Sequence, residues 1–252
     1  MQLVDAHCHL EAEAFSDCLP AVLAAASAAG VTRLVTAATR PDQWARSRAI
    51  AVAHPQVAFA LGVHPWFADT AYLPAIEAMD TSGAAAIGEI GLDGAIEAPA
   101  METQLTVFEA QLALAREREL PVVIHCRRAF DALLPALRRV GELPRGGVVH
   151  AFSGSADVAE LLLPRGFVFS LGRSLTYRPS RKREAVLRRI YPDAMLLETD
   201  SPDMPPAGVD PPNGPKNLRL VLAGAAALLG AAEADIAAAT TANAARIFGW
   251  AP

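Results

Sequence analysis

Short runs of apolar, often β-branched residues alternate along this chain with longer segments whose apolar residues recur at helical spacing. Eight such runs predict strands, each followed by a helical or loop segment. Because the runs are almost continuously apolar, they are typical of strands buried on both faces, as in a parallel sheet. The predicted strands span residues 3–7, 33–38, 57–64, 85–92, 121–126, 146–152, 167–172 and 194–200. The clearest predicted helices span residues 21–30, 101–120, 129–141 and 180–190.

Eight alternations of strand and helix in 252 residues predict an α/β protein with a closed (β/α)₈ TIM barrel. A doubly wound open sheet is the alternative. No repeat or linker interrupts the pattern, so we expect a single domain over residues 1–252. The Pro-rich segment 201–215 is long for a loop and follows the last predicted strand. Since barrels keep functional loops there, we expect it to form an ordered lip over a site.

Polar side chains break or end the apolar runs near their C-terminal ends, where barrel enzymes carry their catalytic residues. His7 and His9 stand two positions apart, so a strand would point both imidazoles the same way. The other such residues are His64, Glu89, His125, His150 and Asp200. Burying such groups without partners would cost several kcal/mol each. Four histidines and two carboxylates form a ligand set for two divalent metals, with Glu89 able to bridge them: His7, His9, Glu89, His125, His150 and Asp200.

Two other kinds of metal site are weaker interpretations of the same residues. A single metal held by one carboxylate and three histidines, His7, His9, His150 and Asp200, would leave Glu89 and His125 without a role. A carbamylated lysine could bridge two metals, but neither Lys182 nor Lys216 ends a predicted strand. A carboxylate bridge by Glu89 is therefore favoured.

Composition limits the partners and the compartment. The formal net charge of −5 argues against a general binder of polyanions, so a nucleic-acid substrate would need local positive charge from metals or arginines. Three cysteines without CxxC spacing predict neither a disulfide framework nor a thiolate zinc site, and Cys8 and Cys126 are expected to be buried and inert. Without a signal-like start or a run of about 18 apolar residues, we expect a cytoplasmic monomer with no membrane partner.

Six motifs follow one another between Val4 and Trp250: "DAHCHL", "GVHP", "IGEIGLD", "PVVIHCRRA", "VVHAFSGS" and "LLETDSPDMPP". In these motifs the chain resembles the TatD family of metal-dependent hydrolases, a deoxyribonuclease family, and in particular its YjjV-like branch. The resemblance implies a TIM barrel with two metals. One metal would be held by His7, His9, Glu89 and Asp200, and the other by Glu89, His125 and His150. It also implies that His64 lines the site and that the activity is nuclease-like.

The leading hypothesis is therefore a divalent-metal-dependent phosphodiesterase that acts on single-stranded DNA ends, like a 3′–5′ exonuclease. Its catalytic residues would be Asp200, as general base toward a metal-activated water, with Glu89 and His64. Its substrate contacts would be His64, Arg127 and Ser153. The metals are left open among zinc, manganese, nickel and magnesium, and a small phosphoester is the other substrate considered.

Two further readings stay open. An amidohydrolase-type enzyme would cleave a small amide, ester or lactone with the same metals, and a barrel that only binds a partner would be catalytically silent. Around the ligands, we expect Glu198 to be a neighbour rather than a ligand, and Asp93 to orient the loop after the fourth strand. Trp66 and Phe67 would either stack a nucleobase or pack under their loop.

Overall fold

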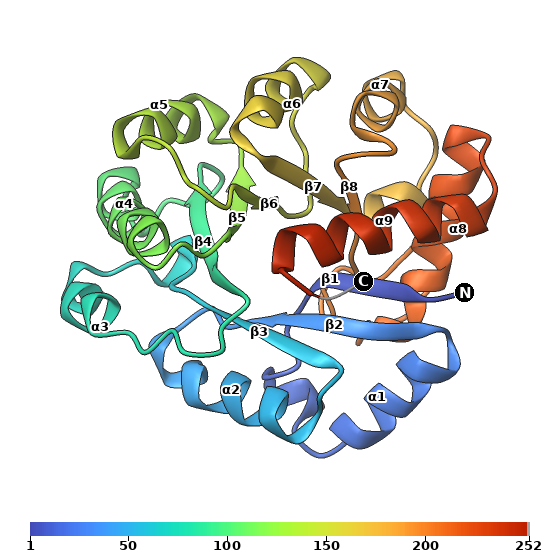
Figure 1. The fold of residues 1–252 in the computed structure, drawn as a ribbon, viewed down its shortest axis with the longest axis horizontal. Helices are drawn as coiled ribbons and strands as arrows, with labels where there is room; N and C mark the ends of the chain where they lie inside the picture. The colour runs from blue at the N-terminus through green and yellow to red at the C-terminus, as the bar shows by residue number, and fades with distance from the viewer. Residues whose placement is uncertain (251–252) are drawn as a thin grey trace.

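In the computed structural model, which describes residues 1–250, eight parallel strands form one sheet in the order in which they occur in the chain (Figure 1). The strands are β1 (Leu3–Cys8), β2 (Val31–Ala37), β3 (Val57–Leu61), β4 (Ala86–Asp93), β5 (Val122–Arg127), β6 (Gly147–Val149), β7 (Phe167–Leu171) and β8 (Met195–Leu197). The α-helices are α1 (Leu19–Ala28), α2 (Trp44–Ala53), α3 (Leu73–Glu77), α4 (Met101–Glu117), α5 (Phe130–Val140), α6 (Ala156–Leu162), α7 (Arg181–Ile190), α8 (Leu218–Leu229) and α9 (Glu233–Phe248).

The first and last strands meet and nearly close the sheet into a barrel. The backbone N–H of Asp200 donates to the carbonyl of His7 at 3.0 Å, and that of His9 donates to the carbonyl of Ser201 at 2.7 Å. Below these bonds, the carboxylate of Asp5 accepts from the backbone N–H and the hydroxyl of Thr199. The TIM-barrel prediction is therefore confirmed, and the open-sheet alternative is wrong.

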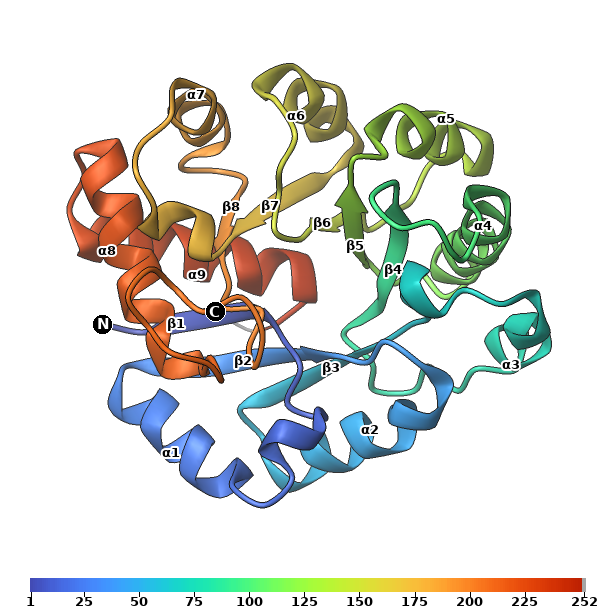
Figure 2. The same ribbon diagram turned by 180° about the vertical axis from the view of Figure 1, so that it is seen from behind.

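The strands are buried on both faces, as their apolar composition predicts. Every residue of β1, β4, β7 and β8 is buried. The helices surround the sheet and cover its outer face (Figures 1 and 2). In α5, for example, Leu133 and Leu137 are buried against the core while Arg138 is exposed. Each fully buried leucine or phenylalanine stabilises the fold by roughly 1.5–3 kcal/mol, so this double coverage supplies the main driving force for folding.

Three predicted strands end earlier in the structure than in the sequence pattern. β3 ends at Leu61, β6 at Val149 and β8 at Leu197. The expectation that His64, His150 and Asp200 end strands is therefore wrong in detail, because all three lie in the loops just beyond. Backbone bonds still hold them in place: the N–H of His64 donates to Thr39 O, and that of His150 donates to Ile124 O, both at 2.9 Å.

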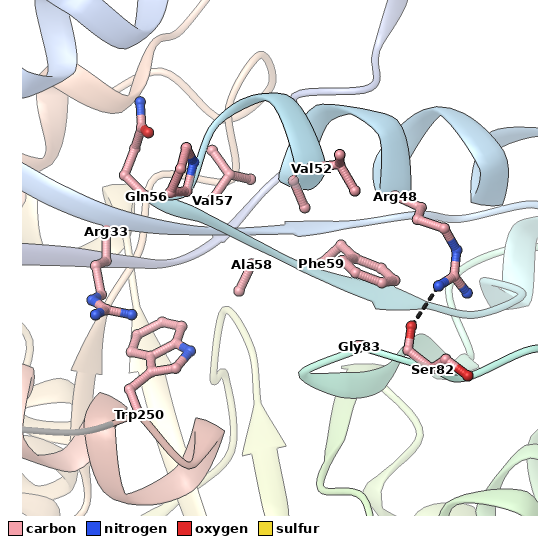
Figure 3. Close-up of a pocket in the computed structure, with 12 residues that line it drawn as sticks. Arg33, Arg48, Val52, Gln56, Val57, Ala58, Phe59, Ser82, Gly83 and Trp250 are labelled. Atoms are coloured by element: carbon pink, nitrogen blue, oxygen red, sulfur yellow. Dashed lines mark hydrogen bonds between the residues drawn. The ribbon is translucent and has the colours of Figure 1, made fainter.

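The N-terminal half of β3, the end of α2 and the loop before β4 line a cavity of about 370 Å³ (Figure 3). The guanidinium of Arg33 lies over the ring of Trp250, and that of Arg48 over the ring of Phe59, each at 5.1 Å. The contact with Arg33 places Trp250, which follows α9, against the end of the barrel opposite the predicted site.

Within residues 1–250, no single helix is long and apolar enough to cross a membrane. One pair, Pro215–Leu229 with Glu233–Phe248, passes that test together by length and composition, but its two helices are bent by 111°.

The thiols provide a direct test of this packing. Cys8 and Cys126 are buried and Cys18 is exposed. Burial raises the pKa of Cys126 to about 12 and that of Cys8 well above its usual range. Since the thiolate is the reactive form, we predict that a chromogenic disulfide reagent at pH 8 rapidly titrates Cys18 alone in the folded protein and all three thiols in denaturant. Rapid reaction of a second thiol in the folded protein would contradict this packing.

Candidate metal centre and active site

The buried carboxylate of Glu89, on β4, is the centre of the predicted site. Its Oε2 lies 3.3 Å from His7 Nε2 and 3.5 Å from His9 Nε2. Its Oε1 lies within 2.8–3.2 Å of a ring nitrogen of each of three other histidines: His64, His125 and His150. The two oxygens thus divide five imidazoles into two groups, with two rings at Oε2 and three at Oε1.

Asp200 belongs to the first group. Its Oδ1 lies 3.2 Å from His9 Nε2 and 3.5 Å from His7 Nε2. The backbone of Asp200 has a left-handed φ of 56°, which aspartate tolerates better than most residues. Among the described residues, three sets of possible ligands have donor atoms within 4.8 Å of one another: His7 with His150 and Asp200, His7 with His9 and Glu89, and His64 with Glu89 and His125. The structure therefore brings together all six residues predicted as ligands, and His64 with them.

The outer nitrogens of two histidines already have partners, and this orients the inner ones. His9 Nδ1 lies 2.8 Å from the carbonyl of Ala37, to which it donates, so its Nε2 lone pair faces Glu89 and Asp200. His125 Nε2 lies 3.2 Å from Asp93 Oδ2, which leaves its Nδ1 lone pair facing Glu89. Metal-ligating histidines are commonly fixed by a carbonyl or carboxylate in this way.

His7 and His150 retain unpartnered nitrogens within the described part of the chain. Both ring nitrogens of His7 and the Nδ1 of His150 are buried without a hydrogen-bond partner. The two rings stack with their centroids 3.9 Å apart. A buried polar atom without a partner costs free energy, and a metal ion facing His7 Nε2 would remove that cost. Together, the residues present fit a divalent cation.

His64 differs from the other four histidines. Its Nδ1 accepts a hydrogen bond from the backbone N–H of Trp66 at 3.1 Å. Burial lowers the pKa of His64, so the ring is neutral near pH 7 and carries its one proton on Nε2, which faces Glu89. In this form His64 offers a hydrogen-bond donor rather than a ligand lone pair. Its role as a catalytic and substrate-binding residue outside the ligand set stays a prediction.

The electrostatics of the site favour a cation between the carboxylates. Burial alone would raise the pKa of Glu89 and Asp200, yet the surrounding imidazoles hold both well below their usual range. Burial alone would lower the pKa of His9 and His150, yet the carboxylates hold both well above their usual range. The carboxylates thus stabilise positive charge on the imidazoles strongly enough to overcome desolvation. A divalent ion would replace those protons as the positive charge.

Two glycines in β4 let this cluster form. A Cβ on Gly88 would lie 2.6 Å from the Cβ of Val123, and one on Gly91, whose φ is 146°, would lie 1.9 Å from the carbonyl oxygen of His125. No larger side chain fits at either position without moving β5. Glycine therefore allows β4 to approach β5 closely, with Gly91 paired to His125, and brings Glu89 beside that imidazole.

Two buried glutamines of α4 hold the loops that follow β3 and β4. Gln111 accepts from the N–H of Val63 at 2.7 Å and donates to its carbonyl at 3.1 Å. Gln104 makes the same pair of bonds with Asp93, at 2.8 and 3.2 Å. Each side-chain amide thus makes the pair of backbone hydrogen bonds that a neighbouring strand would otherwise make. In both cases the backbone segment that it holds carries or adjoins a site residue.

A cavity of about 780 Å³ opens over the ligands at the C-terminal ends of the strands. Arg127 and Ser153, both predicted as substrate contacts, line it, as does Trp66, whose residue surface is 50% exposed. Figure 2 shows the orange segment after β8 crossing in front of β1. Asp203 and Met204 of that segment line the cavity, and the side chain of Asn213 donates to both of their carbonyls. The segment is therefore an ordered lip, as expected.

The sequence-based prediction for Asp93, that it orients the loop after the fourth strand, is incomplete. Besides the backbone N–H of Ala95 in its own loop, its carboxylate accepts from Trp66 Nε1 at 2.7 Å and faces His125 Nε2. These hydrogen bonds outweigh burial and hold the pKa of Asp93 well below its usual range. Asp93 is four positions after Glu89 on one strand, so the period of two places both on the same face. That spacing was the available signal.

Glu198 lies where the sequence suggested, beside the ligands. Its carboxylate accepts from the hydroxyl of Ser170 and from the backbone N–H of Ala151 at 2.8 Å, and its Oε2 is 3.7 Å from His150 Nδ1. Arg173 and Glu11, which sequence reasoning did not single out, also line the cavity. Glu11 accepts from the hydroxyl of Thr36.

A sequence model of the family described as TatD related DNase matches residues 4–249. The chain belongs to the TatD family. It is 37% identical over 229 residues to the metal-dependent hydrolase YjjV of Escherichia coli K12, covering 88% of each chain. It is 33% identical over 244 residues to the 3′-5′ ssDNA/RNA exonuclease TatD of Citrobacter rodentium, covering 90% of each chain. The crystal structure of the E. coli YjjV protein matches with a TM-score of 0.90 and 35% identity, covering 99% of this chain and 98% of that one.

These likenesses confirm the resemblance drawn from the motifs. The protein is a metal-dependent hydrolase of the TatD family, a family with nuclease-named members, which is consistent with action on ester bonds. Family membership therefore favours the enzyme over the catalytically silent barrel. Its His, Glu and Asp clusters are compatible with divalent metal binding.

The role of α4 can be tested by removing one glutamine. Gln111→Leu keeps the volume but leaves the buried N–H and C=O of Val63 without partners, at about 1–3 kcal/mol each. We predict that urea denaturation gives an unfolding free energy lower by about 3 kcal/mol. Thr106→Ala, at an exposed position of the same helix, is the control and should change it by less than about 0.5 kcal/mol. Equal stabilities for the two variants would show that the glutamine does not support the loop.

Proposed function

We propose that this protein binds two divalent ions, one on each side of Glu89. The first ion would be held by Glu89 with three residues of the first group: His7, His9 and Asp200. The second would be held by Glu89 with two residues of the other group: His125 and His150. The observation that carries the proposal is the division of five imidazoles between the two oxygens of Glu89. Since these residues come from strands at both ends of the sequence, we also propose residues 1–252 as one catalytic domain.

The proposed reaction is hydrolysis of a phosphodiester. Metal ions in this ligand set supply polarisation of a phosphoryl oxygen and a lowered pKa for water. Asp200, which the surrounding imidazoles keep ionised, accepts the proton of the attacking water on its carboxylate. Neutral His64 donates a hydrogen bond from Nε2 to an oxygen of the phosphate or of the leaving group. Nitrogen and oxygen ligands in this ratio suit zinc, manganese or nickel, and magnesium less well.

The proposed substrate is the 3′ end of a single nucleic-acid strand, DNA in the first instance. Support comes from the name of the Citrobacter relative, a 3′-5′ ssDNA/RNA exonuclease. Support also comes from the cavity, where Arg127 and Ser153 can contact phosphate and the half-exposed indole of Trp66 can stack a base. Trp66 and Arg127 both approach the same oxygen of Asp93, at 2.7 and 4.0 Å, so base and phosphate contacts lie side by side.

The activity is tested with a 5′-labelled single-stranded oligonucleotide and protein stripped by a chelator. We predict that Mn²⁺, Zn²⁺, Ni²⁺ or Mg²⁺ restores shortening from the 3′ end. Asp200→Asn should lower the rate by about 10²–10⁴-fold because the proton acceptor is lost. Asp193→Asn, an exposed position before the other end of β8, is the matched control and should retain full activity. Metal binding without cleavage of the oligonucleotide would overturn the proposal, and turnover of a lactone or amide would then favour the amidohydrolase alternative.

The support that Asp93 gives His125 is tested by metal affinity. Asp93→Asn removes the charge that fixes the His125 tautomer, so we predict zinc binding about 10–100-fold weaker at one of the two sites, measured by competition with a fluorescent chelator. Arg127→Gln alters a different neighbour of the same oxygen and should leave zinc affinity unchanged. Identical affinities for wild type and both variants would show that Asp93 does not position a ligand.

A further inference from the structure

A strongly basic surface lies beside the cavity in this otherwise acidic protein. Residues 173–183, between β7 and the first turn of α7, carry five of the 22 cations and none of the 27 carboxylates. The rest of the chain therefore has 17 cations and a formal charge of −10. We name this segment the β7–α7 basic surface; its cations are Arg173, Arg178, Arg181, Lys182 and Arg183.

The surface begins inside the cavity and continues outward from it. Arg173 lines the cavity, and its guanidinium lies over the ring of Tyr177 at 5.2 Å. The Nζ of Lys182 donates to the carbonyl of Ser153, another lining residue, at 2.6 Å. Because these residues follow the C-terminal end of β7, they lie at the same end of the barrel as the proposed metal site. Figure 2 shows α7 at the rim, between α6 and α8.

Two of the five cations are free to meet a ligand. Arg178 and Arg181 are exposed, lie outside the cavity and form no ion pair or side-chain hydrogen bond with residues 1–250. Arg178 precedes α7, and Arg181 is the first residue of its first turn, which Ser180 caps by accepting from the N–H of Arg183. A cluster of like charge is electrostatically costly, and the one carboxylate in the first turn of α7, that of Glu184, does not balance five cations. The position of this cluster beside the cavity indicates an anionic partner.

We propose that the β7–α7 basic surface binds the phosphate backbone of the single strand on the 5′ side of the cleaved end. This inference rests on the proposed function, since the strand must enter the cavity with its 3′ end. Arg173 contacts the strand where it leaves the cavity, and Arg178 and Arg181 contact phosphates further along. Arginine clusters that follow a backbone in this way bind strands without sequence preference. The surface makes the enzyme prefer strands over small diesters, although its overall charge repels polyanions.

The test compares two double variants with the same loss of charge. Arg178→Gln/Arg181→Gln removes the two free cations of the surface. Arg138→Gln/Arg188→Gln removes two exposed arginines in the last turns of α5 and α7, at the opposite end of the barrel. Binding of a labelled 20-nucleotide dT strand to chelator-treated protein is followed by fluorescence anisotropy against salt. Cleavage of the same strand, of a dT dinucleotide and of bis(p-nitrophenyl) phosphate is measured with the metal-loaded protein.

The surface variant should bind the 20-mer on the order of tenfold more weakly at 0.1 M salt. Its slope of log affinity against log salt should fall by about 1.4, since each phosphate contact of a single strand contributes about 0.7. Its KM should rise for the 20-mer alone, with the dinucleotide and the small diester unaffected. The control variant should match the wild type throughout.

Equal affinity and equal salt slopes for the two variants would overturn the proposal that the β7–α7 basic surface binds the strand. The proposed nuclease activity would be unaffected by that result. Wild-type protein that hydrolyses the small diester but no oligonucleotide would overturn the proposed function. In that case, weaker strand binding by the surface variant alone would still support strand binding by the β7–α7 basic surface, because the anisotropy measurement needs no cleavage.

Discussion

The carboxylate of Glu89 is the constraint that organises this end of the barrel. A buried negative charge needs several compensating donors or cations, and each of its two oxygens is approached by a separate set of imidazoles. Five histidines from four different parts of the sheet therefore converge on one group. The glycines beside it and the glutamines of α4 are consequences of that demand, since the strands must approach closely and the loops must be fixed before the imidazoles can reach it.

The barrel and the converging residues could be predicted because both follow from simple periodicities. Buried strands leave apolar runs, and a polar residue at the end of such a run is visible in the sequence. The exact strand ends could not be predicted, because His64, His150 and Asp200 keep their places through backbone bonds to neighbouring strands after the regular pairing has stopped. No local sequence pattern predicts such bonds.

The supporting residues were the hardest to find. Gln104 and Gln111 are buried, yet a glutamine in a helix ordinarily faces solvent, and only the tertiary structure shows the backbone groups that they pair with. Asp93 was visible through its spacing from Glu89, but its contacts with Trp66 and His125 depend on a loop from another strand. The sequence pattern of the lysine and arginines that begin α7 does not indicate the bond from Lys182 to the carbonyl of Ser153, which forms only in the tertiary structure.

The two glutamines of α4 also link parts of the site mechanically. They lie seven positions apart, two turns of one helix, so they project from nearly the same side of it. One clamps the segment before His64, and the other clamps Asp93, which orients His125. Because one helix holds both segments, a small displacement of α4 would shift the hydrogen-bond donor His64 and the support of His125 in the same direction. Two loops anchored to separate elements would lack this mechanical coupling.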